Sequence, residues 1–345
     1  MNSSAQISEP KRIAAIVYLR GIAILMVIWS HYITEEVTGI YNPVFKNRQW
    51  LIGQLGVMLF FAISGFVLSF FFFKHNYRIN DYPRFLLKRV VRIEPPYFIS
   101  ILFSVVVYGI VYVMTNRFMY QGNFGDVFLH FFYLNNILHR PWLNGVYWTL
   151  GIELQYYLLI GCVFPLIEKC KGVYFFFVLI AMCCLKIFAV KILQYNNGAS
   201  YLYGKSVFVF YSLPVFMAGT VTCMFYLKYL NLIQFIIGLA ICFVTVDFRS
   251  YNIPDFIIIA LFPILLFLLR NIQRGLVYFI GNASYSVYLV HLPCYFLIRS
   301  FLLPDNAIKK TVLLFASILL TIFLSYLLYR FIEKPFHERS KRIKL

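Results

Sequence analysis

The sequence predicts an all-α membrane protein, a bundle of about ten transmembrane helices with both ends of the chain in the cytoplasm. Of its 345 residues, 61% are hydrophobic and 13% are charged, whereas a soluble domain is roughly half apolar and a quarter charged. Apolar runs recur along the whole chain, and about 20 such residues suffice to cross a bilayer as a helix. Lys and Arg residues gather at the ends of these runs, as topology signals do.

The apolar segments expected to span the membrane cover residues 13–33, 51–73, 95–115, 148–167, 173–193, 206–227, 232–247, 254–269, 283–302 and 311–332. A further apolar piece, 126–138, is too short to cross, and we expect it to be re-entrant or interfacial. Residues 1–12 form a cytoplasmic N-terminal segment, 13–336 a single membrane domain and 337–345 a basic cytoplasmic tail. Arg20 interrupts the first run and no small-residue cleavage site follows, so this run is expected to be a retained helix.

Charge and cysteine content narrow the function classes. With the N-terminus inside, the expected cytoplasmic segments carry about twice as many Lys and Arg residues as the outer ones, which favours this orientation. The net charge of +18 forms no single basic domain, so we expect membrane lipids and no nucleic acid as partners. None of the seven cysteines forms a C-x-x-C pair, so neither a disulfide framework nor a metal site is expected.

Arg20 and His31 are the first polar residues that need an explanation. A charge within a span costs several kcal/mol and is by default a functional hypothesis. The two residues are eleven positions apart, which is only ~20° beyond three helical turns and roughly 16 Å along the axis. They should therefore share a face, although a lone histidine at a membrane interface can also be only a polar tip.

Glu153 lies in WTLGIELQYYL, close to the start of a span. A buried carboxylate needs a partner, and beside His31 it would orient the ring and favour its protonated form. The alternative is a structural ion pair with Arg20 or Lys186.

Arg89 and Arg92 stand three residues apart in KRVVRIEPPY, so on a helix they share a face. Two guanidinium groups suit phosphate, which each can bind in bidentate fashion. Basic residues before a span also follow from the positive-inside rule alone.

Weaker signals complete the set. Ser64 and Gly65 are small residues within a span, which usually permit close helix packing. His291 stands in SYSVYLVHLP beside Tyr285 and Tyr288, as either a site residue or an interhelical donor. Glu333 in YRFIEKPF is interpreted as a structural anchor.

Six segments in this order resemble the acyltransferase 3 family of membrane O-acyltransferases: YLRGIAILMVIWSH, GVMLFFAISGFVLS, KRVVRIEPPY, WTLGIELQYYL, GNASYSVYLVHLP and YRFIEKPF. The resemblance runs from about residue 13 to 336. It implies about ten spanning helices in the cell (inner or plasma) membrane and an acyl-CoA co-substrate, usually acetyl-CoA, with no bound cofactor or metal. Its members acylate surface glycans, lipid-linked sugars and some small molecules, so the expected acceptor is a carbohydrate hydroxyl.

The resemblance also implies roles for individual residues. His31 corresponds to the family's central catalytic residue, Arg20 to an essential partner, Arg89 and Arg92 to the arginines associated with CoA, and Glu153 to the acid of its W-x-L-x-x-E segment. Many members carry an acid where this chain has Val17, and a second Glu where it has Leu154. These departures put the local charge balance in question.

Together these features suggest transfer across the membrane. The donor would arrive from the cytosol at Arg89 and Arg92, and Arg20 would steady it. His31 would take the proton of an acceptor hydroxyl, with Ser64, Tyr285 and His291 as possible pore or oxyanion residues.

Two other function classes fit some of the same features. One is a transporter or flippase for a lipid-linked sugar, against which the chain shows no inverted repeat. The other is the unrelated class of membrane O-acyltransferases that also uses an intramembrane histidine.

Overall fold

Every regular element in the described part of the chain is helical. The computed structural model describes residues 14–33, 35–38, 43–116, 120–135, 137–169, 173–197, 208–246, 252–272, 274–302 and 305–344. The expected N-terminal segment, 1–12, therefore lies outside the described residues. The α-helices are α1 (Ala14–Tyr32), α2 (Glu35–Thr38), α3 (Pro43–Lys74), α4 (Tyr82–Thr115), α5 (Phe124–Leu129), α6 (Trp148–Lys169), α7 (Val173–Asn197), α9 (Leu213–Tyr226), α10 (Leu232–Val244), α11 (Ile253–Leu268), α12 (Leu276–Asn282), α13 (Ser284–Leu302), α14 (Ala307–Leu328) and α15 (Lys334–Lys341).

Each apolar segment expected to span coincides with one of these helices. By length and composition, five helices of the described chain are long and apolar enough to cross a membrane: Ala14–Tyr32, Lys46–Lys74, Ile79–Thr115, Trp148–Lys169 and Ala307–Lys341. The all-α membrane character is thus confirmed, while the number of crossings and the sides of the termini stay predictions. Two helices begin earlier than their apolar runs, α3 at Pro43 and α4 at Tyr82, because polar residues continue the same helix beyond the apolar stretch.

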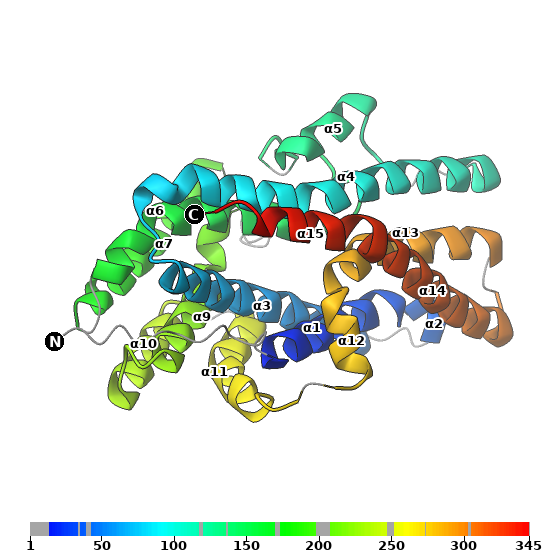
Figure 1. Ribbon diagram of the computed structural model, residues 1–345. Helices are drawn as coiled ribbons and strands as arrows, with labels where there is room; N and C mark the ends of the chain where they lie inside the picture. Colours follow the sequence, from blue (N-terminus) through cyan, green and yellow to red (C-terminus); the bar gives the residue numbers. More distant parts are fainter. Residues whose placement is uncertain are drawn as a thin grey trace.

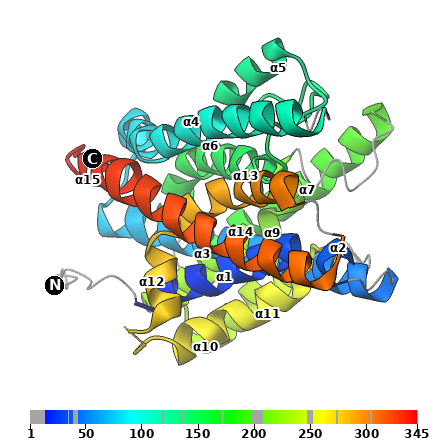
Figure 2. The same ribbon diagram turned by 90° about the vertical axis from the view of Figure 1, so that its right-hand side faces the viewer.

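α1 lies in the middle of the bundle, with α4 and α5 towards one edge and α10 and α11 towards the other (Figure 2). It packs against α3, α12 and α13. Glycine permits the closest approach between helices. A Cβ added at Gly65 of α3 would stand 1.9 Å from the Phe216 carbonyl oxygen, and one at Gly281 would stand 1.9 Å from that of Val17. The small-residue expectation at Gly65 is therefore confirmed as close packing of α3 on α9.

α4 contains two prolines, and a π-helical turn follows α14. Pro95 and Pro96 lie inside α4, where each removes a backbone donor. After α14 the chain makes one π-helical turn, Tyr329–Glu333, and continues into α15. π turns are rare and often accompany functional sites.

The connection between α4 and α6 folds back beside the middle of α4, as Figures 1 and 2 both show. Tyr97 of α4 donates a hydrogen bond to the His130 carbonyl (3.2 Å), and Tyr133 donates to Glu94 (3.0 Å). Its helical pieces, α5 and the 3₁₀ turn His130–Phe132, are too short to cross a membrane. Because it meets α4 more than ten residues before that helix ends, the described part of this connection packs along the side of α4. That 126–138 is re-entrant or interfacial stays a prediction.

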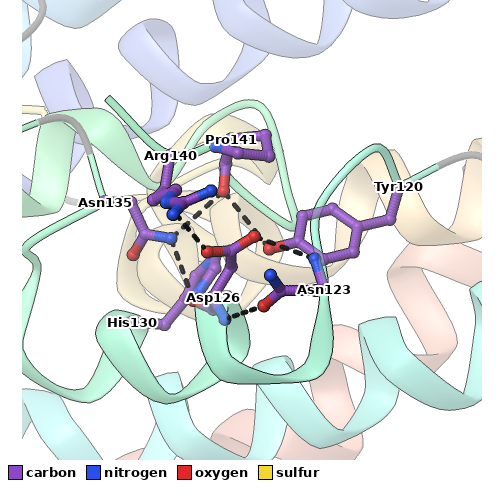
Figure 3. A network of polar contacts seen from close by, with 7 residues as sticks. All are labelled: Tyr120, Asn123, Asp126, His130, Asn135, Arg140 and Pro141. Atoms are coloured by element: carbon purple, nitrogen blue, oxygen red, sulfur yellow. Dashed lines mark hydrogen bonds and ion pairs between the residues drawn. The ribbon is translucent and has the colours of Figure 1, made fainter. Parts of the chain in front are cut away.

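A polar network makes this connection rigid (Figure 3). Asn123 and Asp126 cap each other's backbone amides at 3.0 and 2.8 Å, and Asp126 forms an ion pair with Arg140 (3.4 Å). Asn135 donates to the carbonyls of Asp126 and Pro141, at 3.1 Å each. These bonds satisfy buried polar groups that would otherwise be costly, although Asn135 Oδ1 has no hydrogen-bond partner among the described residues.

Candidate functional site

Two cavities lie one above the other along α1. The first, here the arginine cavity, has a volume of about 120 Å³. Its walls come from α1, α3, α4, α6, α13 and the π turn. The polar residues among its lining are Arg20, Ser64, Arg89, Arg92, Thr149, Glu153, Tyr157, Ser284, Tyr285, Tyr288 and Glu333.

Three arginines meet in this cavity. Arg89 and Arg92 both lie on α4 and both line it, so the expected shared face is confirmed. Arg20 of α1 faces the same space and donates its Nε hydrogen to Ser284 Oγ at 3.0 Å. That bond fixes the guanidinium plane and leaves its remaining N–H groups for other partners. The cavity is thereby suited to an anionic ligand.

Arg89 is held by aromatic rings. Its guanidinium carbon lies 5.2 Å from the ring centre of Phe71, 5.4 Å from Phe85 and 5.6 Å from Tyr157, all within cation–π range. The residue is 8% exposed, and its Nε has no hydrogen-bond partner among the described residues. A buried, cage-held cation with an unused donor is preorganised for an oxyanion.

Glu153 lies in the arginine cavity, and its partners differ from those expected. Its Oε1 accepts hydrogen bonds from Ser64 Oγ at 2.8 Å and from the Tyr157 hydroxyl. Lys186 instead donates to the Thr245 carbonyl. Glu153 lies about one turn beyond the start of α6, and only Trp148 at that start borders the cavity of His31. The carboxylate therefore balances the arginines and does not touch the His31 ring.

Glu333, which the sequence suggested as a structural anchor, anchors the π turn to α13 and also lines the arginine cavity. It ends the π turn and lines the arginine cavity, while its Oε2 accepts from the Ser286 amide (3.1 Å) and hydroxyl (2.6 Å). The sequence indicated its importance only through its place in the segment YRFIEKPF. The extra residue of the π turn, which sets the direction of the side chain, has no signature in the sequence.

The second cavity, here the histidine cavity, has a volume of about 280 Å³. Its lining comes from α1, α3, the start of α6 and α13, and comprises Val27, Ser30, His31, Lys46, Gln49, Trp50, Gly53, Gln54, Val57, Gly145, Val146, Trp148 and Tyr288. Val57 and Tyr288 border both cavities. Arg20 and His31 therefore open into neighbouring spaces that share a wall.

The partner of His31 is His291. The two rings lie 5.1 Å apart between centroids, and His291 Nε2 stands 3.2 Å from His31 Nδ1. His291 Nδ1 lies 2.8 Å from the Tyr288 carbonyl, and Tyr32 donates to the His291 carbonyl at 2.7 Å. His291 thus joins α13 to α1 through His31 and lines neither cavity, so its role as a site residue stays a prediction.

The hydrogen-bond network assigns the tautomers of this pair. A carbonyl can only accept, so His291 Nδ1 must carry the proton, which leaves its Nε2 as the acceptor. His31 Nδ1 must then donate to His291 Nε2. The lone pair of His31 accordingly lies on Nε2, and a neutral His31 is an oriented base.

The hydroxyl groups of Ser64 and Tyr285, expected as possible oxyanion donors, are already engaged. Ser64 donates to Glu153, and Tyr285 donates to the Ile93 carbonyl at 3.0 Å. Both residues line the arginine cavity, so they shape it without offering a free proton. Among the described residues, no group of three His, Cys, Asp or Glu side chains could hold a metal ion.

Comparisons with known proteins show which family the chain belongs to. The chain is 31% identical over 157 residues to a protein of Acidianus two-tailed virus named "Putative acetyltransferase ORF330"; the match covers 45% of this chain and 40% of the viral protein. No solved structure matches significantly. The family model described as an acyltransferase domain matches residues 13–330, almost the whole chain. The chain therefore belongs to the acyltransferase 3 family.

Proposed function

We propose that this protein is a membrane O-acyltransferase that moves an acyl group, in the first instance acetyl, from cytosolic acyl-CoA to a sugar hydroxyl of a surface polysaccharide or lipid-linked glycan. The observation that carries the proposal is the pairing of an oriented His31 with an arginine-lined cavity that shares two wall residues with its own. Family membership supports the acyl transfer.

In the proposed topology about ten helices cross the cell membrane and both termini are cytoplasmic. The distribution of Lys and Arg supports this orientation, because basic segments such as 74–92 and 330–344 fall on the inner side. The arginine cavity then lies on the cytoplasmic side of His31, since Arg20 precedes His31 by three turns of α1.

Acyl-CoA would bind through its phosphates to Arg89 and Arg92. Bidentate guanidinium–phosphate bonds are strong and specific in direction, and the aromatic cage of Arg89 reduces the entropy lost on binding. The pantetheine arm would pass Arg20 and bring the thioester past Val57 and Tyr288 to His31. Glu153 and Glu333 would keep the three arginines compatible with burial when the donor is absent.

At His31, Nε2 would accept the proton of the sugar hydroxyl as its oxygen attacks the thioester carbonyl. The ester C–O bond forms, the C–S bond breaks, and the proton passes from His31 to the departing CoA sulfur. While His31 is positively charged, its Nδ1–H bond to His291 Nε2 would strengthen. This balance describes direct attack. The alternative route has two steps: Nε2 attacks the thioester carbonyl as the C–S bond breaks and CoA thiolate leaves, and the sugar hydroxyl then takes the acyl group from the acyl-histidine while its proton passes to the CoA thiolate.

Label transfer tests the proposal. Purified protein in nanodiscs is incubated with radiolabelled acetyl-CoA and the host's surface-glycan or lipid-linked sugar fraction. Wild type should label the glycan, and His31→Ala, shown to be folded by its melting temperature, should lose at least 100-fold in rate. A folded His31→Ala protein with a normal rate would remove His31 from the mechanism. Absence of transfer from both acetyl-CoA and succinyl-CoA would favour the transporter class instead.

A further inference from the structure

One face of α3 is polar where it borders the histidine cavity. Lys46, Gln49, Trp50, Gly53 and Gln54 all line this space. Their spacing of three and four residues puts them on a single face of the helix. Part of this face lies before residue 51, where the apolar run begins. These polar residues are helical too, so α3 is longer than the apolar run alone predicts.

Gln49 indicates that this face awaits a ligand. Its side chain is 8% exposed, and its Nε2 has no hydrogen-bond partner among the described residues. Buried amide groups in native structures are nearly always paired, so an unpaired one calls for an explanation. Because Gln49 lines the cavity, a molecule bound there would supply the missing acceptor.

Two tryptophans complete the lining. Trp50 of α3 and Trp148 of α6 both border the cavity, and Trp50 is 39% exposed. An indole offers a flat apolar face and one N–H donor. Gly53 keeps this side of the cavity narrow, because a Cβ there would stand 2.4 Å from Ser30 Oγ. α3 is thus held close to the α1 turn that carries His31.

The chemistry of this lining matches a sugar ring. A pyranose presents C–H groups on its faces, which stack on aromatic rings, and hydroxyls around its edge, which pair with amides that both donate and accept. The volume of about 280 Å³ lies near the lower end of the ~300–1,000 Å³ typical of small-molecule sites, so it suits one ring better than an oligosaccharide. Lys46, exposed on the same face, adds a positive charge.

We infer that the polar face of α3 is the acceptor subsite, and that it binds one sugar ring that bears an acidic group. Trp50 and Trp148 stack on the ring, Gln49 and Gln54 bind its hydroxyls, and Lys46 pairs with the acidic substituent. This inference rests on the proposed function for the role of the ring as acceptor, but the binding itself can be measured without any acyl donor.

The test is a titration of tryptophan fluorescence in nanodiscs with neutral, N-acetylated and acidic methyl glycosides. Wild type should bind acidic sugars saturably and at least tenfold more tightly than neutral ones. Gln49→Leu and Trp50→Leu should each weaken the binding about tenfold, whereas Lys46→Gln should weaken only that of acidic sugars. Trp29→Leu is the matched control, because Trp29 is 52% exposed and lies outside the cavity lining; it should bind as wild type does.

Gln49→Leu also has a stability readout. It replaces an unpaired buried amide with an apolar side chain, so the variant should melt at the same temperature as wild type or higher while it loses sugar binding. In the label-transfer assay its KM for the glycan should rise about tenfold, with the KM for acetyl-CoA unchanged. The inference is overturned if no glycoside binds saturably, or if Gln49→Leu and Trp50→Leu bind as wild type does. Sugar binding without any acyl transfer would instead count against the proposed function alone.

Discussion

At the scale of single residues, the geometry assigns His291 to the orientation of His31. Its Nε2 is the acceptor for His31 Nδ1, and its own Nδ1 is fixed by the Tyr288 carbonyl. His291→Ala should lower kcat about 10- to 100-fold with little change in either KM, because the base remains but its orientation is lost. His291→Gln, whose side-chain oxygen can accept from Nδ1, should recover part of the rate. Steady-state kinetics of the two variants check this; equal losses in both, or a change confined to KM, would contradict it.

Arg89 carries a second prediction, because its surroundings suit a guanidinium and not an ammonium group. Lysine retains the charge but loses the planar stacking on Phe71, Phe85 and Tyr157 and the bidentate fork. Arg89→Lys should raise the KM for acetyl-CoA about tenfold, or about 1.4 kcal/mol. Arg84→Lys, on the exposed side of the same helix, is the matched control and should leave the KM unaltered. A wild-type KM in Arg89→Lys would mean that charge alone suffices.

The sequence predicted most of the charged residues that line the two cavities, but not which side chains form hydrogen bonds with one another. Intramembrane charges stand out by their cost, so Arg20, Glu153 and the paired arginines could be identified one by one. The partner of His31 lies 260 positions away in the chain. Its identity depends on the rotation of α13 against α1, which packing of whole helices decides. For the same reason the sequence placed Glu153 beside His31, whereas its carboxylate accepts from Ser64 and Tyr157 in the other cavity.

At the scale of elements, hydrophobic runs predicted where helices occur, because burial in lipid needs only composition and length. The polar residues that precede an apolar run were not expected to belong to the same helix. The first turns of α3 carry the face that lines the histidine cavity, and the first turns of α4 carry Arg89 and Arg92. Gly65 predicts close packing but not the partner helix, since any small residue permits approach.

The connection between α4 and α6 gives a prediction at this scale. Burial lowers the pKa of His130 to about 4, and its Nε2 accepts from the Leu143 amide at 2.8 Å while Nδ1 donates to the Asp126 carbonyl at 2.9 Å. The ring must therefore stay neutral. Because the folded pKa lies below the unfolded value of about 6.5, the unfolded state binds more protons between these values, and stability falls as the pH drops from about 6.5 towards 4.

The loss should reach up to about 3 kcal/mol at the acidic end. Melting temperatures of wild type and His130→Gln, measured from pH 7.5 to 4.5 in the same detergent, check this. The variant cannot titrate at this position, so its curve should be flatter below pH 6.5. Parallel curves for the two proteins would show that His130 is not the group that responds.

At the scale of the whole molecule, the two cavities follow one another along α1 and share Val57 and Tyr288. In the proposed function, two substrates would approach from opposite sides and meet at His31. The arginine cavity would attract a polyanionic donor, whereas the tryptophans, amides and Lys46 of the histidine cavity would suit a sugar ring that bears an acidic group. Neither substrate then has to cross the bilayer.

The most direct test of this account is a sided transfer assay. Proteoliposomes hold radiolabelled acetyl-CoA inside and the glycan acceptor outside, and neither compound crosses the lipid. The account predicts that wild type labels the external glycan, that folded His31→Ala does not, and that little label appears when both substrates are outside. Transfer that occurs only when donor and acceptor share one side would contradict it.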